Sequence, residues 1–398
     1  MQPLERMRAI AVFAIMMSAF YAVVGWWLPP PFWTEQADRA LAHIPWIDEE
    51  RYWSKDELEL TGDSIHGAPV YRATLHTPYL TIDAIYPAMA GPLSVHFFRF
   101  ADWNLDDRVW ITRYAVTSEG DDLPVGSENE WIGRNNLDCN TAEYYTGFQL
   151  PYRVMEPSTP LFTLSQGQTD FSFPEGFGLP FDPKMTLSST AQVLNHNQPE
   201  PGLKVRQRIS IFFVRDKDLQ QRFRPLYQRS LALMVPVGLN ADVKLDSNIT
   251  QCLPSGLLRS RPRINLKGQR ITDHWVLPVG QEERRFKVTD ALQLTQTADV
   301  HALGVHVHPY AEELTFRDHT MDTVLFKSKI QSGTEGIGLK EVQYKVDVVG
   351  SKVYPDHEYE LVYRGNNVSG RSQDMMAVLL VYLYDSELDH LLKIRTGS

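Results

Sequence analysis

Short segments in which apolar and polar residues alternate recur along this chain, and they constrain its fold more than any other feature. The segments 71–87 (YRATLHTPYLTIDAIYP), 91–100 (GPLSVHFFRF) and 206–216 (RQRISIFFVRD) are rich in β-branched and aromatic residues. Turn signals that contain Gly and Pro separate such segments. A period of two is typical of strands that bury one face. The sequence therefore predicts an all-β protein.

The strand-rich segments fall into two blocks, residues 66–216 and residues 234–398. Two successive blocks of this size predict two tandem antiparallel β-sandwich domains of a jelly-roll-like kind. Residues 217–233, between the blocks, have a more helical or irregular pattern and are predicted to form a linker. Residues 32–65 are polar and charged, and we expect them to connect the first block to the amino-terminal segment.

The amino-terminal residues 1–31 have the pattern of a transmembrane helix. Residues 9–28 are uncharged and mostly apolar, a run long enough to cross a bilayer as a helix. Arg6 and Arg8 precede this run, and positive flanks stay on the cytoplasmic side. The run is long and no A-x-A site follows it directly, which favours an uncleaved signal anchor over a cleaved signal peptide. Both interpretations place the main body outside the cytoplasm, in a periplasmic, lumenal or extracellular space.

Net charge bears on whether the chain binds nucleic acid, and cysteine content bears on its disulfides. The formal net charge of −10 argues against a nucleic-acid partner, because phosphate binding needs a basic surface. The two cysteines, Cys139 and Cys252, are able to pair in an exported chain. Free thiols, or a bridge to another chain, are the alternatives.

Two histidines stand two residues apart in the segment 300–318, VHALGVHVHPYAEELTFRD. His306 and His308 alternate with Val305 and Val307, as expected for a strand. Alternate residues of a strand project from the same face, so the two imidazoles are predicted to lie side by side and to offer two nitrogen ligands to one metal. The alternative is a pair of half-buried histidines without a metal.

A second segment supplies a soft ligand. Residues 374–384, DMMAVLLVYLY, form an apolar strand that begins with Asp374, Met375 and Met376. Two imidazoles and a thioether form a ligand set that suits Cu(I). The alternative is that the methionines only fill gaps in the core.

These residues carry a family resemblance. The order GVHVHPYAEELTFRD, DHEYELVYRGNN, DMMAVLLVYLY resembles the carboxy-terminal domain of the copper type II, ascorbate-dependent monooxygenases, which include peptidylglycine α-hydroxylating and dopamine β-monooxygenases. The resemblance implies that His306, His308 and Met376 hold the copper that activates O₂. It also implies an oxidoreductase that hydroxylates a C–H bond of a small molecule or peptide. Ascorbate or another one-electron reductant would supply electrons.

The first block resembles the same family more loosely. In the segment 173–197, His196 stands where the family has a histidine ligand of its electron-storing copper. The family's adjacent histidine pair corresponds here to His96 and Phe97. The resemblance therefore implies a second copper site, with His96 and His196, that lacks one of three imidazoles. His66 and His76 are candidates for the missing ligand.

The resemblance also bears on the substrate. The family's peptidyl-glycine hydroxylases hold the substrate carboxylate with an arginine before the first histidine, and with an asparagine and a tyrosine after the methionine. Gly304, Val378 and Leu380 occupy those positions here. Since glycine cannot replace a bidentate guanidinium, we expect a substrate other than peptidyl-glycine.

Three functions stay open from the sequence alone: a copper monooxygenase, a copper-binding homologue that no longer turns over, and a membrane-anchored β-sandwich interaction protein. Hydrolase motifs such as a nucleophile elbow or His-Glu-x-x-His do not occur. His301 has the opposite strand parity from His306 and is expected to be structural. His357 is expected to be an exposed loop residue.

Overall fold

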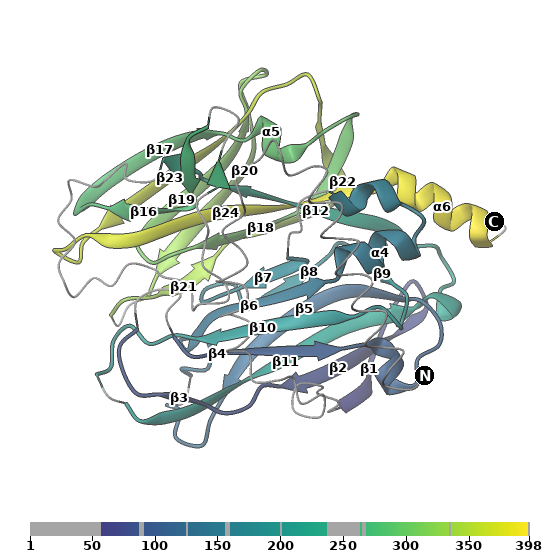
Figure 1. Ribbon diagram of the computed structural model, residues 1–398, viewed down its shortest axis with the longest axis horizontal. Coiled ribbons are helices and arrows are strands. Elements are labelled where there is room, and N and C mark those ends of the chain that lie inside the picture. Colours follow the sequence, from purple (N-terminus) through teal and green to yellow (C-terminus); the bar gives the residue numbers. More distant parts are fainter. Residues whose placement is uncertain are drawn as a thin grey trace, which may run out of the picture. The chain divides into compact units, whose positions relative to one another are not determined.

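Alternating burial along the strands explains why this sequence folds as sheets. In β11 (Leu203–Arg215), for example, alternate residues from Val205 to Phe213 are buried, and Arg206, Arg208, Ser210 and Phe212 between them are more exposed. The computed structural model describes residues 57–86, 91–124, 126–155, 160–199, 201–236, 263–264, 268–333 and 336–396. Most of these residues lie in strands, which confirms the all-β class (Figure 1). The described α-helices are short: α4 (Thr141–Gly147), α5 (Thr289–Leu292) and α6 (Ser386–Thr396).

One long sheet runs through both halves of the described chain, which we define as residues 57–223 and residues 224–396. Its path is β1-β2-β11-β5-β9-β12-β24-β18-β22, with β3 beside β11, β8 beside β5 and β16 beside β24. The bounds are β1 (Glu57–Ile65), β2 (Ala68–His76), β3 (Leu80–Ile82), β5 (Val109–Glu119), β8 (Asp170–Ser172), β9 (Phe177–Phe181), β12 (Arg224–Ala232), β16 (His274–Leu277), β18 (Ala298–Val307), β22 (Lys345–Val353) and β24 (Gln373–Tyr384). The halves join where β9 and β12 pair in parallel.

Smaller sheets face this long sheet. A four-stranded sheet of the first half has the order β4-β10-β6-β7, and a five-stranded sheet of the second half has the order β17-β23-β19-β20-β21. Their bounds are β4 (Leu93–Phe98), β6 (Ile132–Cys139), β7 (Phe162–Leu164), β10 (Leu187–Val193), β17 (Gly280–Lys287), β19 (Ala311–Asp318), β20 (Thr323–Ser332), β21 (Leu339–Val342) and β23 (Tyr359–Asn367). A third sheet joins β13 (Val235–Pro236), β15 (Arg270–Thr272) and β14 (Arg263–Ile264). Short 3-10 turns are η2 (Phe100–Trp103), η3 (Pro151–Met155) and η4 (Asp216–Asp218).

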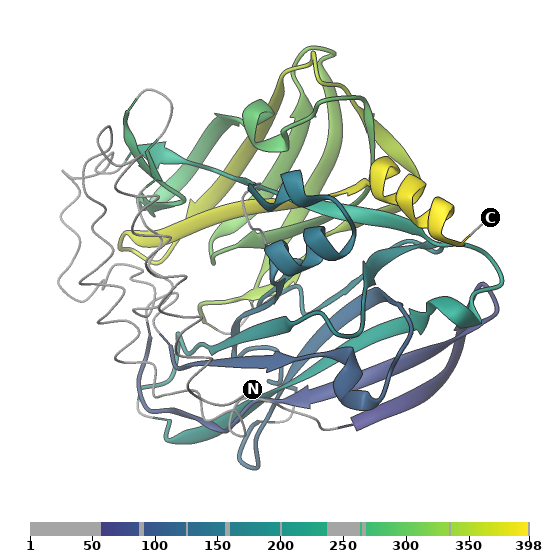
Figure 2. The ribbon, with the colours of Figure 1, turned by 45° about the vertical axis from the view of Figure 1, so that its right-hand side comes forward.

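Strands β18 and β24 are buried on both faces. One face carries Leu303, Val305 and Leu379 into the apolar core of the second half. The other face carries Val378 and Leu380 into the core shared with the first half. Neighbouring strands with two buried faces have continuous apolar runs, which is why segment 374–384 does not alternate. Strands β18 and β24 lie side by side (Figures 1 and 2).

Two predicted boundaries are wrong. The segment 217–233, expected to be a linker, contains strand β12, which pairs with β24 from Leu226 to Ala232. The polar residues of this segment suggested a solvated linker. The guanidinium of Arg229, however, lies over the ring of Tyr227 and is buried. Strand β1 lies inside the expected connector 32–65 and pairs with β2.

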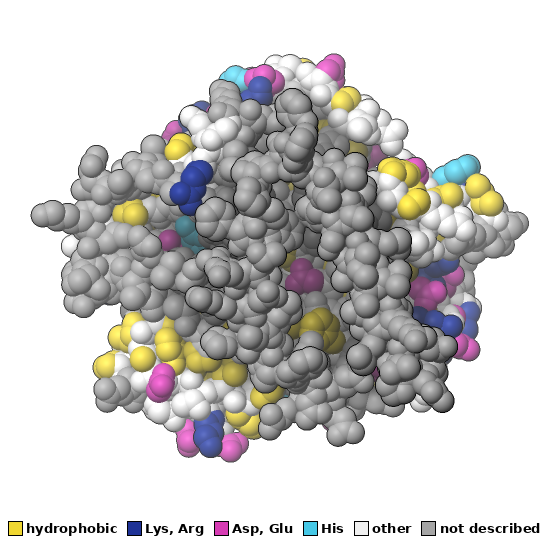
Figure 3. All heavy atoms as spheres, viewed as in Figure 1, with side chains coloured by type: hydrophobic (Ala, Val, Ile, Leu, Met, Phe, Trp, Pro, Cys, Tyr) yellow, Lys and Arg dark blue, Asp and Glu magenta, His cyan; other side chains and the backbone are white. Residues whose placement is uncertain are grey.

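Other expectations concern residues outside the described ranges. These include the apolar run 9–28 and Cys252, so the pairing of Cys252 with Cys139, which the sequence leaves open, also lies outside the described residues. Among the described residues, no helix has the length and apolarity needed to cross a bilayer. On the described part of the surface seen in Figure 3, acidic and basic side chains lie next to one another.

Candidate metal centre

His306 and His308 lie at the end of β18, on the face turned toward the first half. His306 pairs with Val378 of β24, and the amide of His308 donates to the carbonyl of Met376, 3.3 Å away. The two ring centroids are 5.7 Å apart with the planes at 90°. Both side chains are buried. The predicted shared face is therefore confirmed, whereas metal binding stays a prediction.

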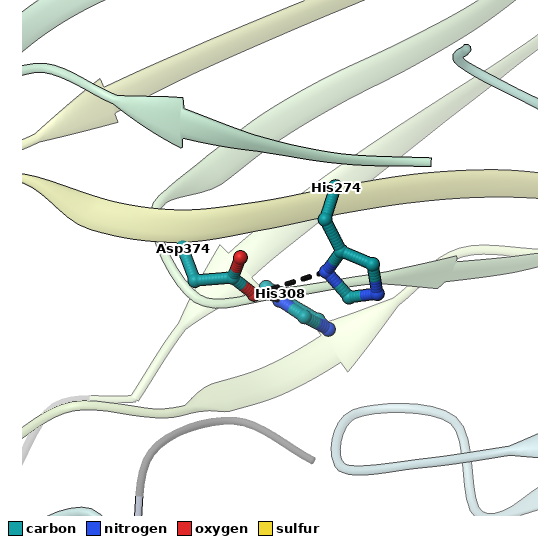
Figure 4. Close-up of side chains that lie close together, drawn as sticks. All are labelled: His274, His308 and Asp374. Atoms are coloured by element: carbon teal, nitrogen blue, oxygen red, sulfur yellow. Dashed lines mark hydrogen bonds and ion pairs between the residues drawn. The ribbon is translucent and has the colours of Figure 1, made fainter. Parts of the chain in front are cut away.

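A third imidazole and a carboxylate join this pair from other strands. His274 of β16 pairs with Met376 of β24, so β24 lies between His274 on one side and His308 on the other. Asp374 projects from β24 two residues before Met376, on the same face. Its Oδ2 lies 3.2 Å from Nδ1 of His274 and 2.9 Å from Nδ1 of His308. Figure 4 shows both rings turned toward this carboxylate.

The electrostatics of the group follow from burial and from this sharing of one carboxylate. Burial alone would raise the pKa of Asp374, but the hydrogen bonds and charges of His274 and His308 hold it well below its usual range. Burial alone would lower the pKa of His274, but the hydrogen bond and charge of Asp374 raise it overall. Burial lowers the pKa of His306 far below its ordinary value, and neighbouring positive groups add to this effect. His306 is therefore a neutral imidazole with a lone pair available.

One nitrogen of each ring faces a protein group, and Nε2 of His274 also lies 3.9 Å from Oδ1 of Asp273. Nδ1 of His274 and Nδ1 of His308 face Asp374, and Nδ1 of His306 lies 3.1 Å from the Ser165 hydroxyl. Nε2 of His306 is buried and has no hydrogen-bond partner in the structure. A carboxylate or hydroxyl on one nitrogen of a histidine is the arrangement that orients the other nitrogen toward a metal.

Two of the three ring pairs have a spacing near that of two imidazoles on one metal. An imidazole ring centre lies about 3.2 Å from a metal when the N–metal bond is about 2.0–2.1 Å, so two rings at a tetrahedral angle lie about 5.2 Å apart. The centroids of His274 and His308 are 5.5 Å apart, close to this value and to the His306–His308 separation of 5.7 Å. The ligand atoms of His274, His308 and Asp374 all lie within 4.8 Å of one another, a group that does not include His306. His306 is a candidate ligand through its ring-to-ring distance to His308, and the Met376 thioether is a candidate soft ligand through its place on β24 opposite His274. Asp374 is the orienting carboxylate or, alternatively, a direct ligand.

The two histidines predicted for a separate first copper site lie in different surroundings. His196 follows β10, and its buried Nε2 has no hydrogen-bond partner in the structure. Burial and the charge of His308 lower the pKa of His196 to about 4, so His196 belongs electrostatically with the group above. His96 lies in β4 opposite Ser189, on the face that also sends Phe98 into the first-half core. The structure therefore brings His196 close enough to His308 for their charges to interact.

Two other histidines differ from expectation. His301 lies at a β-bulge between Val300 and Ala302, which cancels the simple parity rule, and its ring packs 4.0 Å from that of Phe177. His357 is not exposed: its Nδ1 lies 2.6 Å from Oδ2 of the buried Asp318, with the Tyr354 ring 4.6 Å away.

The positions expected to contact substrate are packed instead. A Cβ added at Gly304 would meet the Phe171 ring at 3.2 Å and the Gln168 amide at 3.4 Å. Val378 and Leu380 are buried in the core shared by the halves. An arginine at position 304 would have no room, which agrees with the absence of a carboxylate clamp there.

Sequence reasoning missed His274 and Ser165. His274 stands 100 residues before Asp374 and at the start of a four-residue strand, so no spacing rule connects them. Ser165 belongs to a turn of the first half, and only the packing of the halves brings it to His306. For Asp374 a signal did exist, because it opens the Asp-Met-Met run.

Comparison with known proteins does not assign a family. No protein-family model matches the chain, and no characterised protein matches it in sequence. A solved structure of PNGase F, a glycosylasparaginase from Flavobacterium meningosepticum, aligns with 79% of this chain and 96% of its own at 9% identity, with a TM-score of 0.32. A peptide-N(4)-(N-acetyl-β-D-glucosaminyl) asparagine amidase aligns over the same shares at 10% identity and a TM-score of 0.31. The CUB1-EGF-CUB2 domains of rat MASP-1 align at 9% identity over 78% of this chain and 96% of theirs, with a TM-score of 0.15. Scores this low carry no argument about function.

Proposed function

We propose that this chain is an exported copper-dependent monooxygenase that hydroxylates a substrate C–H bond with O₂. The single observation that carries the proposal is the set of three imidazoles, His274, His306 and His308, whose Nδ1 atoms are held by Asp374 and Ser165 beside Met376. Imidazole and thioether ligands together favour copper over magnesium or calcium. A copper ion held there would supply one-electron redox chemistry toward O₂, with ascorbate or another reductant as the electron source.

The surroundings of the histidine group support this chemistry through low access of water and through the negative charge of Asp374. His306 and His308 are 4% and 5% exposed, so bulk water has little access to their rings. Asp374 holds a negative charge beside two imidazoles, and so offsets part of the charge of a bound cation. Gly304, Val378 and Leu380 offer no carboxylate holder, which supports a small-molecule or peptide substrate other than peptidyl-glycine.

The finer architecture and location belong to the same proposal. The chain would consist of two tandem antiparallel β-sandwiches of jelly-roll-like kind, carried outside the cytoplasm by an amino-terminal anchor. The two facing-sheet cores, one in each half, support the sandwich assignment. The apolar run 9–28 with Arg6 and Arg8 before it supports the anchor.

A second candidate function is a copper-binding protein that does not turn over. The observation that favours it is the place of His96, which faces the first-half core opposite Ser189, with Phe97 next to it in the position of a family histidine. A first copper site built from His96 and His196 would therefore be weak or missing. Electron delivery would then be slow or would come from elsewhere.

A pair of methionine variants tests the copper site with a matched control. We expect Met376→Leu to keep the fold, because the volume is nearly conserved, and to weaken Cu(I) binding about tenfold through loss of the thioether. Met375→Leu is the control, because Met375 is fully buried in the second-half core on the opposite face. Cu(I) affinity is measured by competition with a chromophoric chelator.

Three outcomes separate the candidate functions. Copper binding with ascorbate-driven oxygen uptake supports the monooxygenase, and copper binding without uptake supports the non-catalytic protein. No copper binding by the purified chain would leave only a β-sandwich interaction protein. Equal Cu(I) affinities for Met376→Leu and Met375→Leu would remove Met376 from the site.

A further inference from the structure

A tight turn of the first half reaches across to the second half and contacts β18. It consists of Ser165, Gln166, Gly167 and Gln168, between β7 and β8, and is closed by a bridge between its first and last residues. Gly167 adopts φ = 84°, a conformation that favours glycine, and a Cβ there would meet Val342 at 2.9 Å. The turn is therefore shaped to fit against strand β21, which contains Val342.

Hydrogen bonds fix this turn to two strands of the second half. The Val342 amide donates to the Gly167 carbonyl at 2.9 Å, and the Leu339 amide donates to the Gln166 side chain at 3.0 Å. The Val305 amide donates to the Gln168 side chain at 3.1 Å. Val305 lies just beyond Leu303, where the pairing of β18 with β22 ends, so Gln168 satisfies an edge amide that the ladder leaves open.

Ser165 makes the remaining contact, and it is to a candidate metal ligand. Its Oγ lies 3.1 Å from Nδ1 of His306, and both residues are buried. Nε2 of the same ring is buried and has no hydrogen-bond partner among the residues that the structure describes. A buried imidazole with one satisfied and one orphaned nitrogen is costly unless a ligand completes it.

We propose that Ser165 is a positioning residue for the metal centre: it accepts a hydrogen bond from Nδ1–H of His306 and so leaves the Nε2 lone pair facing the metal. The inference rests on the proposed metal centre and extends it, because one ligand is then oriented by the other half of the chain. The turn ties the geometry of the site to the packing of the halves. Ser165 contacts the ring. The turn is held by three separate hydrogen bonds, from Leu339 to Gln166, from Val342 to Gly167 and from Val305 to Gln168, so the loss of one of them leaves Ser165 in place.

Variants of the full-length chain separate this role from general packing. We expect Ser165→Ala to weaken copper binding about ten- to a hundredfold and to change the Cu(II) electron paramagnetic resonance spectrum. Ser165→Thr, which keeps the hydroxyl, should restore both. Gln166→Ala is the matched control: it removes a hydrogen bond of the same turn to Leu339, so it should lower the thermal midpoint and leave the spectrum unchanged.

Two results would overturn the assignment. One is a Ser165→Ala protein with wild-type copper affinity and spectrum, and the other is an equal loss of affinity in Ser165→Ala and Gln166→Ala. Nitrogen-15 NMR of the metal-free chain gives a readout that does not depend on copper. A His306 ring protonated on Nδ1 supports the positioning role, and one protonated on Nε2 contradicts it. If the wild-type chain binds no copper, the proposed function fails while the NMR result still decides the role of Ser165.

Discussion

Two buried polar regions of this molecule differ in how many of their polar atoms have hydrogen-bond partners within the protein. In the first half, Asn135 accepts hydrogen bonds from Tyr114 and Ser189 and donates to the Gln207 side chain at 2.9 Å. Gln207 in turn donates to the Gln192 carbonyl at 2.8 Å. These hydrogen bonds are made among protein groups, and a satisfied buried network of this kind makes a core rigid and specific.

The histidine group in the second half does not close in the same way. Its members face one another through Asp374 and Ser165, while Nε2 of His306 is buried without a hydrogen-bond partner among the described residues. Native interiors rarely leave buried polar atoms unpaired. The contrast indicates that a ligand is expected where a buried polar atom lacks a partner in the protein, and not simply where buried polar side chains cluster.

The largest expected effect breaks the closed network. Asn135→Ala removes the shared partner of Tyr114, Ser189 and Gln207 and leaves buried polar atoms unpaired, at about 1–3 kcal/mol each. We expect the free energy of unfolding to fall by about 3 kcal/mol or more, measured by urea denaturation. Copper content should stay at the wild-type level, since none of these side chains belongs to the histidine group. A loss of copper at unchanged stability would reverse the distinction between the regions.

A second effect compares two buried carboxyl groups. Burial raises the pKa of Asp138 to about 6, and the charge of Arg134 offsets this only in part, whereas two imidazoles lower the pKa of Asp374. Because folded Asp138 holds its proton more tightly than the unfolded chain does, its contribution to stability is lost as pH rises from about 4 to about 6. Asp138→Asn should remove that loss and be about 2–3 kcal/mol more stable than wild type above pH 6, with little difference below pH 4. Urea denaturation at several pH values measures it, and parallel pH profiles for the two proteins would contradict it.

The smallest expected effect is a change in copper affinity, and it tests the histidine group. Asp374→Asn keeps the shape of the side chain but removes the charge that faces His274 and His308. We expect copper affinity to fall about ten- to a hundredfold, the usual range for losing a group that orients metal ligands. Titration with a competing chelator measures this, and Asp138→Asn serves as the control for loss of a buried carboxylate elsewhere. Tighter copper binding by Asp374→Asn would mean that the carboxylate does not orient these rings.

Local pattern predicted what depends on neighbouring residues. The alternation of Val305 and Val307 with the histidines predicted the shared face of His306 and His308, and the recurring short strands predicted the all-β class. Pattern did not predict what depends on packing between distant segments. His274 reaches Asp374 through the pairing of β16 with β24. The bulge at His301 likewise arises from its partners in the sheet.

The parallel junction of β9 and β12 decides how the two halves can come apart. Arg224 and Pro225 pair with Phe177 and Gly178, so the first half and the second half share one hydrogen-bonded ladder instead of a flexible connection. Pulling them apart would bare two strand edges together with the apolar side of β24, a surface that is prone to self-association in water. We therefore expect neither half to be soluble by itself, and a candidate catalytic site at their border to acquire its shape only when the whole chain has folded.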